Sequence, residues 1–271
     1  MTMRERVVLK WGGGLITEKH ALKTVRTGVL DHLAEQIESC LRDGIDVILV
    51  HGAGSFGHLR AKEHRLNEGK LPEDDINGSM TQEEAVEAVR NDMLELNAHV
   101  MQALTRHDIS AVTLSPHQWA RNTGAGFSGD LALFEQAPQG IVMVSHGDVV
   151  DCDEPRRFGI LSGDDLVLRL ATEIPGVKRL VFAMGGVDGV LADPPQANVD
   201  DVLLPTLRKT DLFTGEHAVE MDVTGGIGLK VERGFQVTAK GIEVLLVNGE
   251  KDRRVADACM GKDVVGTRLL A

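Results

Sequence analysis

Two glycine-rich turns, each directly after a short apolar run, constrain this sequence more than any other feature. The first apolar run spans residues 6 to 11 and leads into three consecutive glycines at 12 to 14, which we call the first glycine turn. The second run spans residues 47 to 50 and leads into residues 52 to 57, the second glycine turn. Glycines let a backbone turn tightly and present N–H groups to an anion, so both turns are typical of phosphate-binding sites. Two such turns indicate a phosphate donor and a phosphate acceptor.

The composition favours a globular protein with a sizeable core. Of 271 residues, 42% are hydrophobic and 26% are charged, which fits one domain with two lobes as well as two domains. The net charge of -12 argues against a broad surface for nucleic acid or anionic membrane.

The N-terminus lacks a signal-peptide pattern and no apolar run approaches the roughly 20 residues of a membrane span, so we expect a cytoplasmic protein. Cys40, Cys152 and Cys259 are widely spaced, which predicts reduced thiols and no zinc site.

Hydrophobic periodicity predicts strands alternating with amphipathic helices. We expect strands over residues 6–11, 47–50, 111–114, 141–144, 180–183 and 244–247, and helices over 20–43, from 81 onward, 165–172 and 229–240. The third-position glutamate after Thr81 predicts a capping box at that helix start. In such a parallel α/β sheet the loops after the strands ending near Leu9, Val50, Val144 and Ala183 share one edge, where ligands collect. Residues 60–78 are expected to form a mobile loop or lid.

Familiar nucleotide motifs do not account for the turns. Gly52, Gly54 and Gly57 formally match the dinucleotide-binding pattern, but no acidic residue follows at the end of a next strand about 20 residues on. Neither turn contains the P-loop signature, and the protein-kinase signatures are absent. A phosphotransferase built on this chain therefore needs another architecture.

Further segments at predicted strand-to-helix junctions supply that architecture. They are Ser162-Gly163-Asp164-Asp165 and the run from Asp222 to Lys230, together with Lys19 and the loop from His51 to His58. With them the chain resembles the amino acid kinase superfamily and, within it, the isopentenyl phosphate kinases, over nearly its whole length. The resemblance implies a three-layer αβα sandwich with a central, mostly parallel sheet. It also implies one domain over residues 1–271, with the acceptor in the half up to about 175 and the nucleotide in the half from 176.

The resemblance implies a role for each matching residue. It implies catalytic roles for Lys10, Lys19, His58, Asp164 and Lys230. It places the acceptor substrate at Ala53, Gly54, His58, Gly163 and Met93, and ATP at Lys10, Gly12, Gly13, Gly14, Gly54, Asp188, Gly226 and Lys230. The implied reaction is ATP-dependent phosphorylation of isopentenyl phosphate to isopentenyl diphosphate in isoprenoid biosynthesis by the mevalonate pathway. The implied enzyme is a homodimer, with Mg²⁺ bound mainly through the ATP phosphates and not by a dedicated protein site.

Physical chemistry supports this division of the site. Phosphoryl transfer needs positioning and charge neutralisation, which lysines and backbone N–H groups supply. A phosphate monoester is already largely dianionic at neutral pH, so His58 is more useful as a hydrogen-bond donor than as a base. The alternative interpretations are that His58 caps a loop and that Asp164 and Asp165 satisfy helix N–H groups. His51 is expected to pack behind its loop.

The hydrocarbon end of the substrate has no motif of its own. A five-carbon chain needs an apolar pocket, which Met93, Leu96, Val100 or residues near Phe127 could line, although the same residues suit an ordinary helix core.

Departures from the family pattern bear on nucleotide preference: Gly14 stands where the family has serine, Ala53 replaces a glycine, and glycine occupies 185 and 186. The alternatives are a kinase for another small phosphate or phosphonate, such as a fosfomycin-type kinase, and a non-catalytic nucleotide-binding sensor.

Overall fold

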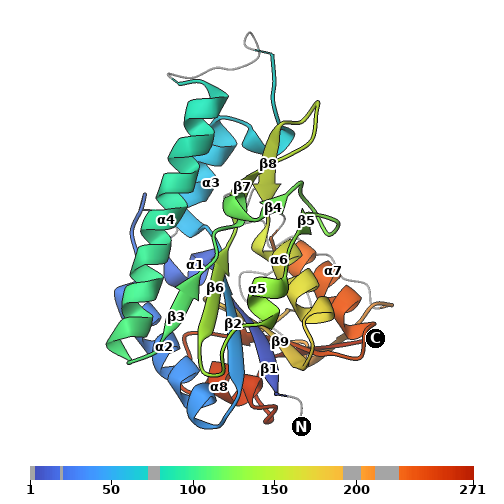
Figure 1. Cartoon of the computed structure of the whole chain (residues 1–271). Helices are drawn as coiled ribbons and strands as arrows, with labels where there is room; N and C mark the ends of the chain where they lie inside the picture. The colour runs from blue at the N-terminus through green and yellow to red at the C-terminus, as the bar shows by residue number, and fades with distance from the viewer. Residues whose placement is uncertain (1–3, 19–20, 73–79, 192–202, 211–225) are drawn as a thin grey trace, which may run out of the picture.

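An eight-stranded sheet forms the centre of the protein in this computed structural model, which describes residues 4–18, 21–72, 80–191, 203–210 and 226–271 (Figure 1). Its strand order is β10-β12-β11-β9-β1-β2-β6-β3. The strands are β1 (Arg6–Trp11), β2 (Asp46–His51), β3 (Ala111–Thr113), β6 (Val142–His146), β9 (Val177–Met184), β10 (Thr206–Arg208), β11 (Glu243–Asn248) and β12 (Thr267–Leu270). A second sheet has the order β5-β4-β7-β8, from β4 (Ala120–Arg121), β5 (Ser128–Gly129), β7 (Asp148–Asp151) and β8 (Phe158–Leu161).

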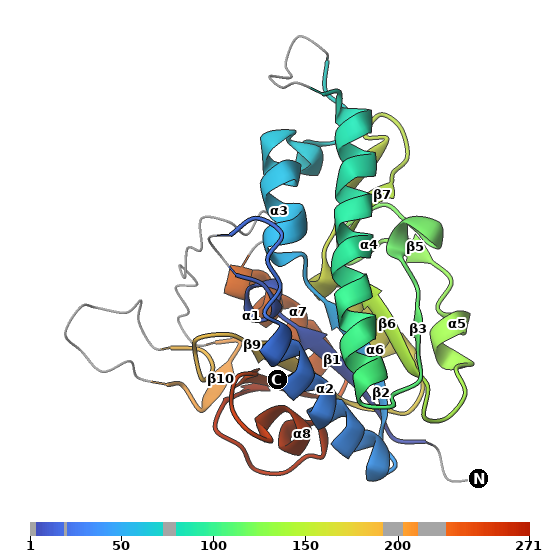
Figure 2. The same ribbon diagram turned by 90° about the vertical axis from the view of Figure 1, so that its left-hand side faces the viewer.

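Helices cover both faces of the large sheet. They are α1 (Gly13–Ile16), α2 (Thr27–Arg42), α3 (Gly54–Glu63), α4 (Gln82–Arg106), α5 (Ala132–Glu135), α6 (Gly163–Glu173), α7 (Gly226–Thr238) and α8 (Arg254–Cys259). Apolar residues of α2, α4 and α8 form one core cluster with the sheet, and those of α5, α6 and α7 form another. Figures 1 and 2 show α2 and α4 on one side of the sheet and α6 and α7 on the other. The predicted three-layer αβα sandwich is therefore confirmed.

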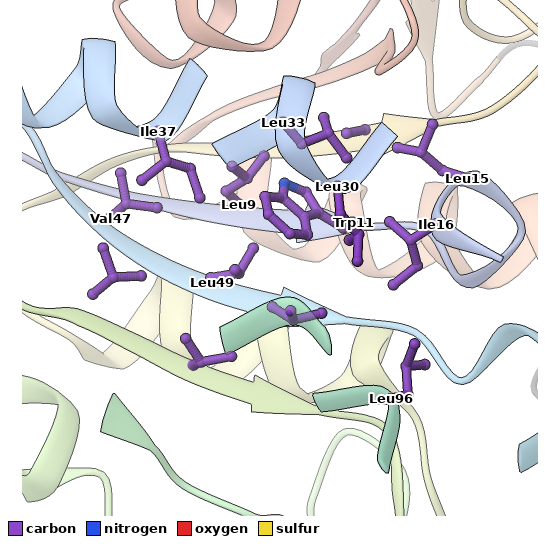
Figure 3. Close-up of a cluster of buried hydrophobic side chains, with 14 of the residues drawn as sticks. Leu9, Trp11, Leu15, Ile16, Leu30, Leu33, Ile37, Val47, Leu49 and Leu96 are labelled. Carbon is purple, nitrogen blue, oxygen red and sulfur yellow. The ribbon is translucent and has the colours of Figure 1, made fainter. Parts of the chain in front are cut away.

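The alternation of side chains along β1 explains why both faces need cover. Val7, Leu9 and Trp11 belong to the core cluster on the α2 side, whereas Val8 belongs to the cluster on the α6 side. Figure 3 shows the Trp11 indole packed among apolar side chains that include Leu30 and Leu33 of α2. Because successive residues of a strand point to opposite faces, Lys10 is directed to the same side as Val8.

The central strands are parallel, as expected. β1 pairs in parallel with both β2 and β9, and β2 pairs in parallel with β6. The turns that follow these four strands therefore lie at one edge of the sheet. β12 differs, because it runs antiparallel to β11.

Local structure departs from the sequence predictions in three places. The helix expected over 20–43 begins at Thr27, because residues 21–23 form a turn and Val25 pairs with Thr17 in a backbone bridge; residue 20 lies outside the described part of the chain. The expected loop over 60–78 starts inside α3, and its residues 73–79 lie outside the described part of the chain. The small second sheet has strands of only two to four residues, which are too short for a periodic signal.

The capping box predicted at Thr81 is confirmed. Thr81 and Glu84 form the capping box of α4, in which Glu84 N donates to Thr81 Oγ1 at 3.2 Å and Thr81 N donates to Glu84 Oε2 at 2.8 Å. The three cysteines are free and buried. Within the described ranges, none of the helices combines the length and apolar character that a bilayer crossing requires.

Candidate active site at the carboxyl edge of the sheet

A cavity of about 310 Å³ opens where β1, β2, β6 and β9 end. Both glycine turns line it, together with the first residues of α6 and α7 and apolar side chains of α3, α4, β7 and β8. The predicted site residues that line it are Lys10, Gly12, Gly13, Gly14, Ala53, Gly54, His58, Met93, Gly163, Gly226 and Lys230. Residues predicted for donor and acceptor thus share one cavity.

The two glycine turns touch each other through their backbones. A β-carbon at Gly13 would lie 2.2 Å from Gly54 N, and one at Gly52 would lie 2.6 Å from Gly13 N. Gly54 also has a φ of +50°, in the left-handed region that favours glycine. Any side chain at position 13 or 52 would force the turns apart, so glycine is required there for close approach. The two turns, which were expected to share one edge of the sheet, therefore face each other there.

A lysine–aspartate–lysine group lies beside the turns. Lys10 Nζ is paired with Asp164 Oδ1, and Lys230 Nζ lies 3.5 Å from Asp164 Oδ2. Asp164 is 1% exposed and Lys10 is 5% exposed. Lys230 also donates to Gly226 O at 3.1 Å, within the first turn of α7. Two ammonium groups around one carboxylate leave a net positive charge at the cavity wall, which suits an anionic ligand.

Asp164 is not the N-cap of α6, because its neighbour Ser162 holds that position. Ser162 is the N-cap of α6, and its Oγ accepts a hydrogen bond from Asp164 N at 3.0 Å. The carboxylate of Asp164 is therefore directed to the lysines, although the residue does occupy the first turn of the helix. Gly163 leaves room for this arrangement, since a β-carbon there would lie 3.1 Å from Lys10 Cε.

A second ion pair, which sequence reasoning did not identify, joins α6 to α7. Arg233 Nε donates to Asp165 Oδ1 at 2.7 Å. Burial raises the pKa of Asp165, while the guanidinium of Arg233 acts in the opposite direction. Lys230 and Arg233 are three residues apart and therefore share a face of α7. This spacing is the sequence signal that places Arg233 on the same side of the helix as Lys230, although it does not name Asp165 as the partner. The pair holds the helix that carries Lys230 against the helix that carries Asp164.

The acceptor side of the cavity has a polar and an apolar part. His58 lies half-buried on α3 and lines the cavity. Met93 of α4 packs on Gly57, where an added β-carbon would be 3.2 Å from Met93 Sδ. The apolar lining, which we call the apolar lobe, consists of Ala61, Val89, Met93, Val149, Ile160 and Leu161.

The other apolar candidates belong to the core. Leu96, Val100 and Phe127 are buried in the two core clusters and do not line the cavity. Their helical or loop positions allow either role, and packing against the sheet decides it. Met93 combines both roles, because it is 1% exposed and still borders the cavity.

Two buried histidines stand behind the turns. His51 and His146 occupy paired positions at the ends of β2 and β6, with ring centroids 5.2 Å apart. Their Nδ1 atoms lie 3.2 Å from Gly52 O and 3.0 Å from Gly147 O. Burial lowers the pKa of His51 to about 3 and also lowers the pKa of His146. The expectation for His51 is confirmed, whereas His146 was not predicted, because its partner strand is distant in sequence.

Asp148 also lines the cavity without having been predicted for the site. Its Oδ2 lies 2.7 Å from His117 Nδ1, and its Oδ1 accepts from Val149 N at 2.9 Å. These contacts direct the carboxylate into the protein and fix the start of β7. We therefore assign Asp148 to the wall of the cavity and to no reaction step.

Asp188 and Lys19 are the remaining predicted site residues. Asp188 is outside the cavity lining and accepts hydrogen bonds from Asn248 at 3.0 Å and Arg254 at 2.5 Å. Burial opposes ionisation of Asp188, but these two partners hold its pKa below the usual value. Its neighbours Gly185 and Val187 do line the cavity, and its role toward ATP stays a prediction. Lys19 and residues 222–225 lie outside the described part of the chain.

Comparisons with known proteins agree with this geometry. The model of the amino acid kinase family matches residues 5–248. The chain is 34% identical to isopentenyl phosphate kinase of Thermoplasma acidophilum, covering 96% of this chain and 98% of that one. It is 30% identical to the enzyme of Methanothermobacter thermautotrophicus, covering 97% and 98%. An X-ray structure of isopentenyl phosphate kinase superposes with a TM-score of 0.79 at 27% identity, over 97% of this chain and 100% of that one. The chain belongs to the amino acid kinase family.

Proposed function

We propose that this protein transfers the γ-phosphoryl group of ATP to isopentenyl phosphate, forming isopentenyl diphosphate and ADP for isoprenoid biosynthesis. The observation that carries the proposal is the single cavity in which two touching glycine turns, a lysine–aspartate–lysine group and an apolar lobe meet. The similarity to isopentenyl phosphate kinases over nearly the full length of the chain supports it. In the reaction an acceptor phosphate oxygen bonds to the γ-phosphorus as the bond to the ADP oxygen breaks.

The two turns divide the substrates between them in this proposal. The ATP phosphates bind at the first glycine turn and near Gly226, and the acceptor phosphate binds at Ala53 and Gly54. His58 donates a hydrogen bond to the acceptor phosphate. Residues up to about 175 form the acceptor half and those from 176 the nucleotide half of one domain.

Lys10 and Lys230 offset the charge that makes two phosphates repel each other. Their ammonium groups reach the same carboxylate, Asp164, so one residue orients both cations. Positioned cations of this kind stabilise the charge on the transferring phosphoryl group, which is the main requirement of phosphoryl transfer. We propose Lys19 as a further cation on the donor side.

Mg²⁺ is expected to enter with ATP. In the described part of the chain there is no group of three or more His, Cys, Asp or Glu residues that could hold a metal ion. Asp148, the carboxylate in the lining, is already bonded to His117 and Val149. The residues that are present therefore fit Mg²⁺ bound through ATP phosphates, where it would add positive charge at the transferring group.

The apolar lobe is the basis for choosing a prenyl substrate. Its aliphatic side chains and Met93 offer a five-carbon chain dispersion contacts and no hydrogen bonds. A small polar phosphonate would leave this surface uncovered. We also propose a cytoplasmic homodimer, by analogy with the family, and light scattering on the purified protein tests the dimer.

A substrate panel tests the function. Purified protein is incubated with Mg-ATP and, separately, isopentenyl phosphate, dimethylallyl phosphate or fosfomycin, and phosphorus NMR follows diphosphate formation. We expect the prenyl monophosphates to be phosphorylated much faster than fosfomycin. Preference for fosfomycin would contradict the prenyl assignment, and tight ATP binding without any transfer would favour the sensor alternative.

His58→Ala provides the test of the acceptor site. Because His58 is assigned to the acceptor phosphate, its loss should raise KM for isopentenyl phosphate about 10- to 100-fold, the effect of losing a hydrogen bond to a charged group. The KM for ATP should change little. Leu59→Ala, at an exposed neighbour on the same helix, is the matched control. An effect confined to the KM for ATP would refute the assignment.

A further inference from the structure

The hydroxyl of Thr17 joins the two glycine turns. Thr17 is 1% exposed and follows α1 directly. Its Oγ1 donates to Gly13 O at 2.9 Å and accepts from Ser55 N at 3.0 Å. Gly13 belongs to the first glycine turn, and Ser55 lies in the second, within the first turn of α3. One side chain therefore contacts the turn proposed for the donor and the turn proposed for the acceptor.

We propose that Thr17 is a positioning residue that sets the separation between the transferring and the accepting phosphate groups. This inference rests on the proposed function, because it assigns the two turns to the two substrates. Thr17 lines the cavity, but its hydroxyl proton is directed to Gly13 O and one lone pair to Ser55 N–H. It acts through the backbone of the turns and not on the reacting atoms.

Further contacts surround the Thr17 hydroxyl, which we call the bridge between the two glycine turns. A β-carbon at Gly54 would lie only 2.1 Å from Thr17 Oγ1, so the second turn is packed directly on the hydroxyl. The chain after Thr17 returns to the same place: Lys23 N donates to Ser55 O at 3.3 Å and Thr24 N lies 3.4 Å from Ser55 Oγ. Thr17, Lys23 and Thr24 thus all contact Ser55 at the start of α3.

The hydroxyl is the chemically required part of the side chain. Valine has nearly the same shape as threonine but can neither donate to Gly13 O nor accept from Ser55 N–H. The buried Ser55 N–H would then lose the hydroxyl, and Gly13 O would keep only the hydrogen bond from Thr17 N at 3.0 Å, so the direct link between the turns would be lost and they would relax away from each other. Since phosphoryl transfer depends steeply on the spacing of the reactants, a misplacement of about 1 Å lowers the rate by about 100-fold.

Thr17→Val and Thr17→Ser separate the hydroxyl from the methyl group. With isopentenyl phosphate and Mg-ATP, we expect Thr17→Val to lower kcat about 10- to 100-fold while both KM values stay within about threefold. Thr17→Ser should restore kcat to within about threefold of the wild type. A Thr17→Val enzyme with kcat within threefold of wild type would overturn the proposal, and so would a serine variant as slow as the valine variant.

Thr267→Val is the matched control for loss of a buried threonine hydroxyl. Thr267 of β12 is 0% exposed, accepts from Val190 N at 2.8 Å and donates to Leu204 O at 2.6 Å. β12 contributes no residue to the cavity lining. We expect Thr267→Val to lower the melting temperature about as much as Thr17→Val does, while its kcat stays at the wild-type value. If kcat falls as much as in Thr17→Val, the effect is one of general stability and the positioning role is refuted.

Amide hydrogen exchange tests the bridge without any turnover. Exchange at Ser55 N–H should be at least 10-fold faster in Thr17→Val than in the wild type and the serine variant. Unchanged exchange would refute the bridge even in an active enzyme. A wild type that transfers no phosphate, yet shows this exchange pattern, would instead refute the proposed function and leave the bridge intact.

Discussion

The buried histidines behind the glycine turns make the stability of this protein depend on pH between 7 and 5. His51 is fully buried, and burial lowers its pKa from 6.5 to about 3. His146 is buried beside it, and its pKa is also lowered by burial. The His51 ring is therefore neutral in the native protein over this range, whereas the same residue becomes protonated in the unfolded chain.

The sign and size of the effect follow from proton linkage. As pH falls through 6.5, the unfolded chain binds a proton at position 51 that the native protein does not bind. The stabilisation is therefore complete above the unfolded pKa of 6.5 and is lost progressively as pH falls toward the native pKa of about 3. Between pH 7 and pH 5, this one histidine lowers the free energy of unfolding by about 2 kcal/mol. His146 adds a loss of the same sign.

Urea denaturation of the wild type and of His51→Asn measures this term. Unfolding at pH 7 and pH 5 is followed by tryptophan fluorescence, because Trp11 is fully buried. At pH 7 the variant should be less stable by about 1–3 kcal/mol, because a buried hydrogen-bonding partner is removed. Between pH 7 and pH 5, however, it should lose about 2 kcal/mol less than the wild type.

His107→Asn is the control for removing a histidine, since His107 is a partly exposed residue distant from the glycine turns. The reasoning is refuted if the wild type and His51→Asn lose the same stability over this pH interval. It is also refuted if His107→Asn reduces the pH dependence as much as His51→Asn does.

Two further substitutions address the centre of the cavity. Lys10→Met removes one of the two cations on Asp164, so kcat at saturating substrates should fall about 100- to 1,000-fold. The exposed Lys178→Met is the control in these steady-state measurements. A Lys10→Met kcat equal to that of the control would show that Lys10 takes no part in the reaction. Gly13→Ala places a methyl group 2.2 Å from Gly54 N, so the turns must separate and kcat should fall about 100-fold. An alanine variant that retains wild-type kcat would show that the contact of the turns is not needed.

The features that the sequence predicted are local ones. Glycine runs after apolar runs identified both glycine turns, because glycine conformations and strand burial depend on neighbouring residues. The Thr81 capping box and the helical periodicity of α4 were equally readable, since their partners lie within four residues. Strand alternation also explains why Lys10, two residues after Val8 in β1, is directed toward α6. Its aspartate partner was first suggested by family resemblance.

The tertiary structure decided which distant groups meet. Thr17 lies beside Ser55, His51 beside His146, and Arg233 beside Asp165 only because parallel strands bring their ends to one edge and helices pack over that edge. Residues such as Leu96 and Met93 are alike in sequence terms, yet the first is core and the second borders the cavity. Propensity and periodicity act over a few residues, whereas these contacts depend on how layers pack in three dimensions. The sequence alone therefore determined the two glycine turns, and the fold determined their spacing.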